Sequence, residues 1–429
     1  MTDTGSGDEM NPLHEDTHHF DDSVRFITAL TKAIDQYGGH SHNTDKTIQH
    51  IIKVLGLKGE ILAVPNTMIL ALWQDNMHHQ TIHIATTRQT NYDMARLGKV
   101  RDLIGEVEGG RVSPADGLIR LKEIERAPAH YGNYQKALAF FLAGAGFGVI
   151  LGISWLDVFI GGVLGLIAFG VELLAARTSL VVNNTPELFI SLVIAFLAGI
   201  TGVVLPGIHP LAVTVCALTI YIPGFALTLA PREVLFGDTL SGLIYFTNAL
   251  FISLKLLLGT ILGLGIAHYL FPVAVTEPLA GVDPVFIWVF IPLLLVSNAI
   301  LFGVSRDYLW LVIICGLLVW AGVQGGNMFG FWQGYFIGAI VLALYARIAA
   351  RRFSIPHSAV LLPVVLILVP GFLFIQALYM FNANQVIAGI SAGFQVVVII
   401  AAIICGIFIG DIVGSWNGIK NTDEEIKER

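Results

Sequence analysis

Charge is scarce in this sequence. Charged residues make up 13% of its 429 residues, about half the share of roughly 25% found in globular domains. Hydrophobic residues make up 55%. This balance excludes a soluble globular protein and predicts an integral membrane protein in contact with a lipid bilayer.

Cysteine is scarce as well, and several catalytic motifs are missing. The three cysteines, Cys216, Cys315 and Cys405, all lie in apolar runs, where they predict small-residue packing and no disulfide framework. No phosphate-binding G-x-x-x-x-G-K-[ST] loop is present, so ATP-driven transport is not supported. No kinase motif set is present, and an enzyme is not predicted.

Metal ligands and nucleic-acid contacts are not predicted either. Ten of the 13 histidines lie in the first 132 residues, but no cysteine or carboxylate cluster completes a metal-ligand spacing beside them. The expectation is a protein without a metal or cofactor and without a nucleic-acid partner.

The few charges are distributed unevenly, and this predicts the domain organisation. Residues 1–132 contain 13 of the 24 Lys and Arg, residues 133–419 contain eight, and the tail contains three. The acidic start has no apolar core and is not a signal peptide. We predict a disordered segment at 1–22, a cytoplasmic α/β domain at 23–132, a membrane domain, and a charged cytoplasmic tail at 418–429.

Changes in periodicity predict the elements of the α/β domain. Helical spacing comes first in "SVRFITALTKAIDQYGG" and "NTDKTIQHIIKVLGL", and strand-like alternation follows in "GEILAVPNTMILALWQD" and "QTIHIATT". Two further amphipathic segments follow, the second with Ser113 as its cap and Pro114 in its first turn.

Ten apolar segments of membrane-spanning size follow this domain. They lie near 135–152, 155–174, 188–205, 208–230, 240–270, 284–304, 307–323, 331–350, 357–380 and 385–415. With the first domain in the cytoplasm, every inner connection contains arginine and every outer connection contains neither Lys nor Arg. This alternation follows the positive-inside rule and predicts that both termini are cytoplasmic.

A Pro-Gly pair interrupts the fourth segment, and a second copy interrupts the ninth. "YIPGF" contains Pro223 and Gly224, and "LVPGF" contains Pro370 and Gly371, 147 positions later. Other glycines match at the same offset, and upstream matches follow at an offset of 155. Proline removes a backbone donor, so each break leaves polar groups that need protein, water or ligand as partners.

The ordered matches predict two homologous halves, 133–272 and 284–417. Each half has five segments, an odd number, so the second half must enter the bilayer from the opposite side. The predicted fold is a polytopic α-helical membrane protein with ten transmembrane helices in two inverted five-helix repeats, preceded by a small cytoplasmic α/β domain. Many secondary transporters have inverted repeats with broken helices at the midplane.

These motifs also resemble the threonine/serine exporter family. The resemblance runs from about Phe20 to Gly418 and rests on "YGGHSHNTDKTIQHIIKVLGL", "IHIATTRQTNYDMARLGKV" and the two PGF motifs. It implies an exporter of threonine and serine across the cytoplasmic (inner) membrane, driven by the proton-motive force. Relatives made of two chains imply dicarboxylate (succinate-like) export as an alternative substrate.

Polar residues inside the spans are the candidates for substrate binding, because such residues are costly in lipid. Lys255 in the fifth segment could pair with a substrate carboxylate or with an internal acid. Asn248 and Gln395, at matching places in the two halves, could bind substrate or join helices. The predicted substrate site therefore comprises Lys255, Asn248, Gln395 and the two breaks, Pro223, Gly224, Pro370 and Gly371.

Four residues are candidates for proton coupling: Asp238, Asp411, His209 and His357. The two acids are near predicted cytoplasmic span ends, where helix capping is an alternative role. The two histidines begin the two broken segments and titrate near neutral pH. Glu172 and Glu233 are further candidate proton carriers near cytoplasmic span ends, with capping as the alternative role. Glu187 is predicted to lie in a loop.

Two other classes of protein stay open at this point. A membrane-anchored sensor or enzyme would act through the first domain, and a channel would not need alternating access. The sequence also leaves open whether the protein forms a homo-oligomer.

Overall fold

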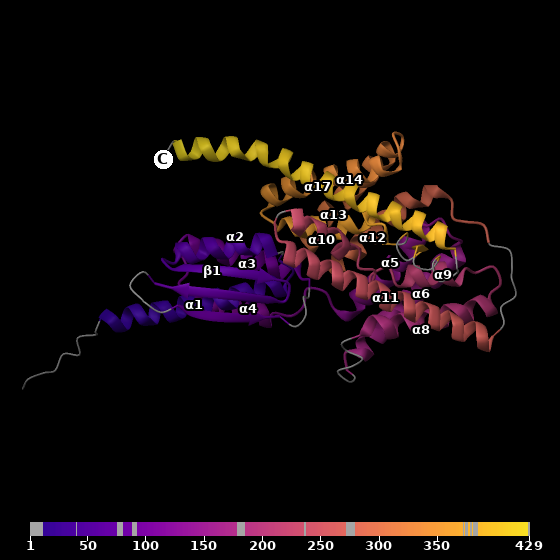
Figure 1. Ribbon diagram of the computed structural model, residues 1–429, viewed down its shortest axis with the longest axis horizontal. Helices are drawn as coiled ribbons and strands as arrows, with labels where there is room; N and C mark the ends of the chain where they lie inside the picture. Colours follow the sequence, from indigo (N-terminus) through magenta and orange to yellow (C-terminus); the bar gives the residue numbers. More distant parts are fainter. Residues whose placement is uncertain are drawn as a thin grey trace, which may run out of the picture. The chain divides into compact units, whose positions relative to one another are not determined.

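The chain folds into two compact units, Met1–Ala129 and His130–Arg429 (Figure 1). The computed structural model describes residues 12–427 apart from 40, 75–79, 88–91, 178–184, 236, 272–278, 372, 374–375, 378–379 and 381–384.

The first unit contains helices and strands around one apolar core. Its elements are α1 (Pro12–Gln36), α2 (Ser41–Val54), β1 (Lys58–Val64), β2 (Thr67–Trp73), β3 (Thr81–Thr86), α3 (Met94–Glu108) and α4 (Pro114–Arg126). α1 begins at Pro12 and so includes residues 12–22, which the sequence analysis placed in a disordered segment.

The three strands form an antiparallel sheet in the order β1-β2-β3. Strand alternation turns Leu70 and Leu72 toward the helices, where they are buried with Phe26 and Ile51. The α1 residue Asp35 is buried at the edge of this core and accepts a hydrogen bond from Thr87 Oγ1. Burial raises the pKa of Asp35 above its ordinary 3.8 in spite of this hydrogen bond.

Helix α4 shows how local sequence sets an element boundary. Ser113 is its N-cap, with its hydroxyl accepting from the backbone N–H of Asp116, and Pro114 occupies the first helical position. A serine followed by proline is favourable there because the first helical N–H groups lack intrahelical partners.

The second unit is helical throughout its described part. Its elements are α5 (Asn133–Ile150), α6 (Trp155–Ala175), α8 (Pro186–Val204), α9 (Pro210–Ala217), α10 (Gly224–Leu235), α11 (Thr239–Leu270), η1 (Pro284–Phe286), α12 (Ile287–Leu301), η2 (Arg306–Tyr308), α13 (Leu309–Asn327), α14 (Phe331–Phe353), α15 (His357–Leu368) and α17 (Val386–Lys427). α17 extends into the predicted tail, 418–429.

Among the described residues, seven helical stretches are long and apolar enough to cross a membrane. They are α6, α8, α11, η1 with α12, η2 with α13, α14, and α17 as far as Gly414. Three of the ten predicted segments are not among these seven helices, each for a local reason. α5 starts with the polar residues "NYQK", the segment 208–230 is divided between α9 and α10, and α15 has only 12 residues.

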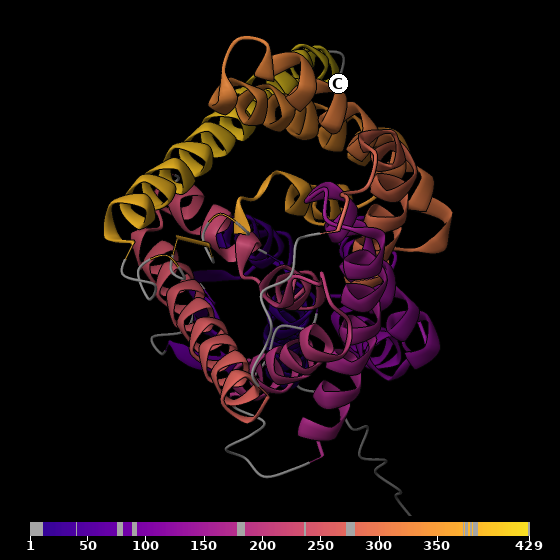
Figure 2. The same ribbon diagram turned by 90° about the vertical axis from the view of Figure 1, so that its right-hand side faces the viewer.

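Glycines let two pairs of helices pack closely (Figure 2). On α11, a Cβ at Gly263 would lie 2.4 Å from the carbonyl oxygen of Leu192 in α8. On α17, a Cβ at Gly410 would lie 3.0 Å from the carbonyl oxygen of Ile340 in α14. Such small residues let membrane helices approach at backbone distance.

The segment that leads into α5 is attached to the connection between α12 and α13. The Tyr131 hydroxyl donates to the carbonyl oxygen of Val304 at 2.7 Å, and His130 Nε2 accepts from the backbone N–H of Arg306 at 3.2 Å. The Arg306 guanidinium also lies 5.6 Å from the centre of the Tyr131 ring. The chain therefore enters the second unit in contact with residues far along the sequence.

Candidate functional site

The two Pro-Gly breaks adopt the same local turn. Gly224 N–H donates to the carbonyl oxygen of Ile222 at 2.7 Å, and Gly371 N–H donates to that of Val369 at 2.9 Å. Each proline is thus the central residue of a three-residue turn. The turn uses one backbone pair that the interrupted helix would otherwise leave unsatisfied.

The breaks also contact each other reciprocally. A Cβ added to Gly224 would lie 2.4 Å from Val369 Cγ1, and one added to Gly371 would lie 2.6 Å from Ile222 Cγ2. In each contact, the glycine of one break meets the residue before the proline of the other. Gly224, Pro370 and Gly371 are buried, and Pro223 is half-buried.

Lys255 is paired with an acid. Its Nζ lies 3.1 Å from Glu187 Oε2, with side-chain exposures of 28% and 20%. Glu187 is the second residue of α8 and does not lie in a loop as predicted, because Pro186 starts the helix one residue earlier. Lys255 is therefore level with the beginning of α8, even though it is near the middle of α11.

A second polar pair lies immediately before the first break. The Tyr221 hydroxyl donates to Glu172 Oε2 at 2.7 Å. Tyr221 packs against an apolar cluster that includes Ile190 of α8 and Leu256 of α11. The two polar pairs thus border one cluster.

The two predicted amide ligands have exposed side chains. Asn248 lies two turns before Lys255 on α11 and has an exposed side chain, and Gln395 on α17 is exposed as well. The hydrogen bonds given by the described residues do not join either amide to a break or to Lys255. Their role as substrate ligands stays a prediction.

His209 lies beside an acid that the sequence did not single out. Asp157 in the first turn of α6 is fully buried and accepts from the His209 backbone N–H at 2.9 Å. Its second oxygen lies 3.2 Å from His209 Nδ1 and accepts from the Ser154 hydroxyl at 2.8 Å. The spacing of Ser154 and Asp157 predicts a helix cap, so it gave no sign of a histidine partner.

The other proton candidates have identifiable positions. Asp238 caps α11 by accepting from the backbone N–H of Ser241 at 3.0 Å. Asp411 on α17 lies 3.3 Å from Arg347 on α14. His209 is the N-cap residue before α9, and His357 is the first residue of α15.

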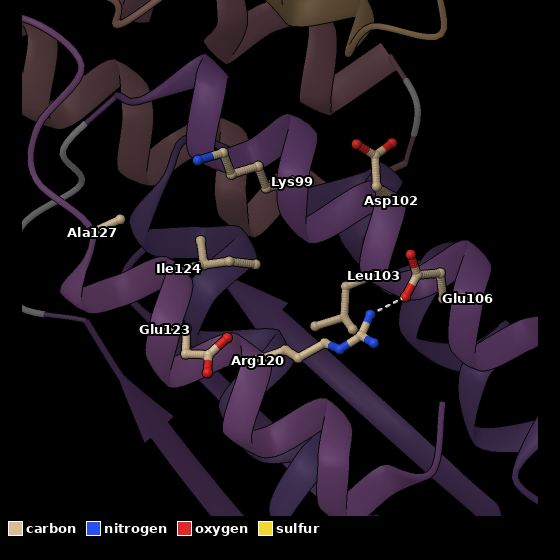
Figure 3. A pocket seen from close by; sticks show the side chains of 8 residues that line it. All are labelled: Lys99, Asp102, Leu103, Glu106, Arg120, Glu123, Ile124 and Ala127. Carbon is tan, nitrogen blue, oxygen red and sulfur yellow. Dashed lines mark hydrogen bonds and ion pairs between the residues drawn. The ribbon is translucent and has the colours of Figure 1, made fainter. Parts of the chain in front are cut away.

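The first unit has a shallow groove of about 330 Å³ between α3 and α4 (Figure 3). It is lined by Lys99, Asp102, Leu103, Glu106, Arg120, Glu123, Ile124 and Ala127. Arg120 reaches across the groove to pair with Glu106. Basic and acidic side chains are mixed here, so the groove does not present a field of one sign to a ligand.

Seven helices long and apolar enough to cross a membrane, counted among the residues that the structure describes, define a polytopic helical membrane protein. Comparison with family models then identifies the family. Residues 25–267 match a model described as "Putative threonine/serine exporter", and residues 286–413 match one described as "Threonine/Serine exporter, ThrE". The chain belongs to the threonine/serine exporter family.

Similar curated proteins occur in fungi. "Pheromone-regulated membrane protein 10" of Saccharomyces cerevisiae is 22% identical over 357 residues, which are 81% of this chain and 46% of that protein. The protein of the same name in Yarrowia lipolytica is 25% identical over 247 residues, 56% of this chain and 20% of that protein. This chain spans less than half the length of either relative. No solved structure matches the chain.

Proposed function

We propose that the protein is a secondary transporter that exports threonine and serine across the cytoplasmic membrane in exchange for protons. Family membership supports the class, and one observation carries the mechanism: the reciprocal contact of Gly224 with Val369 and of Gly371 with Ile222. A local two-fold axis between the halves would produce such a contact. In many secondary transporters, broken helices of two repeats meet at the substrate site.

The proposed membrane topology has ten spans in two inverted five-helix halves, with both termini in the cytoplasm. α5 and the two interrupted segments complete the count beside the seven uninterrupted spans. Equivalent packing supports the repeat: α11 lies on α8 through Gly259 and Gly263, and α17 lies on α14 through Gly406 and Gly410. The arginines of the inner connections support the orientation.

Alternating access would proceed by movement of one half against the other around the paired breaks. Lys255 is the proposed ligand of the substrate carboxylate, because it is the one lysine within the uninterrupted spans and its partner Glu187 could be exchanged for a substrate group. Asn248 and Gln395 are proposed as further polar ligands.

Proton coupling is proposed to involve the titratable candidates in the second unit. His209 is the preferred one, because its ring faces the buried Asp157 carboxylate at 3.2 Å. Asp411, Asp238 and His357 complete the set.

Efflux from proteoliposomes tests the proposal. Vesicles preloaded with labelled serine, threonine or succinate would be followed with and without a proton gradient. We expect gradient-dependent efflux of serine and threonine, and loss of it in Lys255→Met. Absence of gradient-sensitive flux would refute the exporter, and normal transport by Lys255→Met would remove that lysine from the site.

A further inference from the structure

We propose that Glu172, Tyr221, Glu187 and Lys255 form one binding site for a zwitterionic α-amino acid, in which Glu172 and Tyr221 receive the ammonium group. This inference rests on the proposed transport function and specifies its substrate site. The four residues come from α6, the turn before Pro223, α8 and α11.

The first argument is proximity to the break. Tyr221 is two residues before Pro223, and its hydroxyl holds the Glu172 carboxylate at 2.7 Å. Glu187 lies 3.1 Å from Lys255. Tyr221 packs in the same apolar cluster as Ile190, three residues after Glu187, and Leu256, next to Lys255. The two pairs therefore border one cluster beside the segment that contacts the second half.

The second argument is charge. Two carboxylates and one ammonium give the site a net charge of −1 when Tyr221 is neutral. A substrate carboxylate can take the place of Glu187 at Lys255, and a substrate ammonium can then lie between Glu172 and Glu187. Lys255 and Glu187 each keep an opposite charge beside them during this exchange, and Glu172 gains one, as partly buried charges require.

The net charge of the site also indicates the class of substrate. A zwitterion adds no net charge to the site, whereas a dicarboxylate adds two negative charges to a site that contains two carboxylates and a single lysine. Like charges at close range are costly in a partly buried site. The site therefore favours an amino acid over succinate.

The third argument is that only the first half has these groups. The close contacts of Gly263 with Leu192 and of Gly410 with Ile340 align α8 with α14 at an offset of 148. At this offset Glu187 corresponds to Tyr335. At the offset of 155 found upstream, Glu172 corresponds to Asn327, and at the offset of 147 that relates the two breaks, Tyr221 and Lys255 correspond to Leu368 and Ala402. None of these is a carboxylate or an ammonium. The halves thus share the break and differ in this set of charges, which predicts one substrate molecule per protein.

The test uses the full chain in proteoliposomes loaded with unlabelled serine, into which labelled serine exchanges. Four compounds compete with the label: serine, 3-hydroxypropionate without the ammonium, ethanolamine without the carboxylate, and succinate. We expect the two single-charge analogues and succinate to compete at least about tenfold less well than serine, because each lacks one charged contact or adds repulsion.

The variants separate the two ends of the substrate. Glu172→Gln should raise the KM for serine about tenfold and leave inhibition by 3-hydroxypropionate unchanged, because that compound has no ammonium. Tyr221→Phe should raise the KM about fivefold through loss of one hydrogen bond. Glu187→Gln should strengthen inhibition by 3-hydroxypropionate, because it frees Lys255. Asp283→Asn, which removes an exposed carboxylate at the start of η1, is the matched control and should behave as wild type.

Distinct results overturn the two proposals. If wild type exchanges serine and Glu172→Gln keeps the wild-type KM, the ammonium site is wrong although the transporter stands. Tyr221→Phe decides in the same way if Glu172→Gln does not reconstitute. Equal competition by succinate would overturn the substrate class. If wild type exchanges neither serine nor threonine, the transport function falls and the site falls with it.

Discussion

The reciprocal contact of the two breaks gives a sharp prediction for Gly224→Ala. Its new Cβ would lie 2.4 Å from Val369 Cγ1 and 3.0 Å from Val369 Cβ, whereas carbon atoms pack at about 3.5–4.0 Å. The methyl group must therefore displace Val369 or the break itself. Overpacking of this kind costs about 1–3 kcal/mol, which corresponds to a factor of about 5 to 150 between the packed and displaced states.

A double-mutant cycle isolates this contact. Val369→Ala removes the Cγ1 atom that the new methyl group meets, so it should restore in Gly224→Ala most of the lost stability. We expect a coupling energy of about 1–3 kcal/mol in the free energy of unfolding, measured by denaturant titration in detergent. The reciprocal cycle with Gly371→Ala and Ile222→Ala should give a value of similar size, because the corresponding contact is 2.6 Å.

Gly265→Ala on α11 is the matched control, since a Cβ there meets nothing within 4 Å. It should leave stability unchanged or raise it by up to about 1 kcal/mol, the difference in helix propensity between glycine and alanine. If the Gly224 and Val369 substitutions are additive within about 0.5 kcal/mol, the breaks do not support each other in the folded protein and the reasoning fails.

Three further predictions concern other parts of the chain. Asp157→Ala removes the carboxylate that contacts the Ser154 hydroxyl, the His209 backbone N–H and His209 Nδ1. The free energy of unfolding should therefore fall by about 3 kcal/mol or more. A decrease no larger than that of Asp283→Ala would contradict this. The raised pKa of Asp35 means that its contribution to stability is fully present below pH 3.8 and is lost as pH rises through the raised pKa. Asp35→Asn should therefore increase hydrogen-exchange protection of α1 at pH 7, an advantage that should disappear below pH 3.8; equal protection at pH 7 would refute the assignment. On a cysteine-free background, Leu279→Cys should react with an impermeant maleimide from outside the cell while Arg177→Cys and Asp307→Cys should not, and the opposite pattern would exclude the proposed orientation.

The sequence predicted features that depend on local chemistry. Alternation located the two stretches that contain the three strands, and the Ser113-Pro114 pair located the start of α4. Each proline-glycine break fell where the motif required it, because the loss of a backbone donor is a property of proline itself. The start of α1 at Pro12 was not predicted, because this segment is polar and carries little apolar periodicity.

The partners of the polar side chains could not be predicted. Lys255 and Glu187 are 68 positions apart, and Asp157 and His209 are 52 apart. Periodicity states which face of a helix a residue occupies, but it does not state which other helix lies opposite. Asp157 in particular reads as a cap within its own turn, and only the packing of α9 against α6 turns that cap toward a histidine.

The attachment of His130 and Tyr131 to the connection between α12 and α13 has a mechanical consequence. Both residues precede α5, the first helix of the first half. They form hydrogen bonds with Val304 and Arg306, which belong to the second half. Any motion that separates α5 from that connection must either break both bonds or pull the linker with it. In the proposed alternating-access cycle, a movement of one half against the other would therefore place tension on the linker that leads from the first unit.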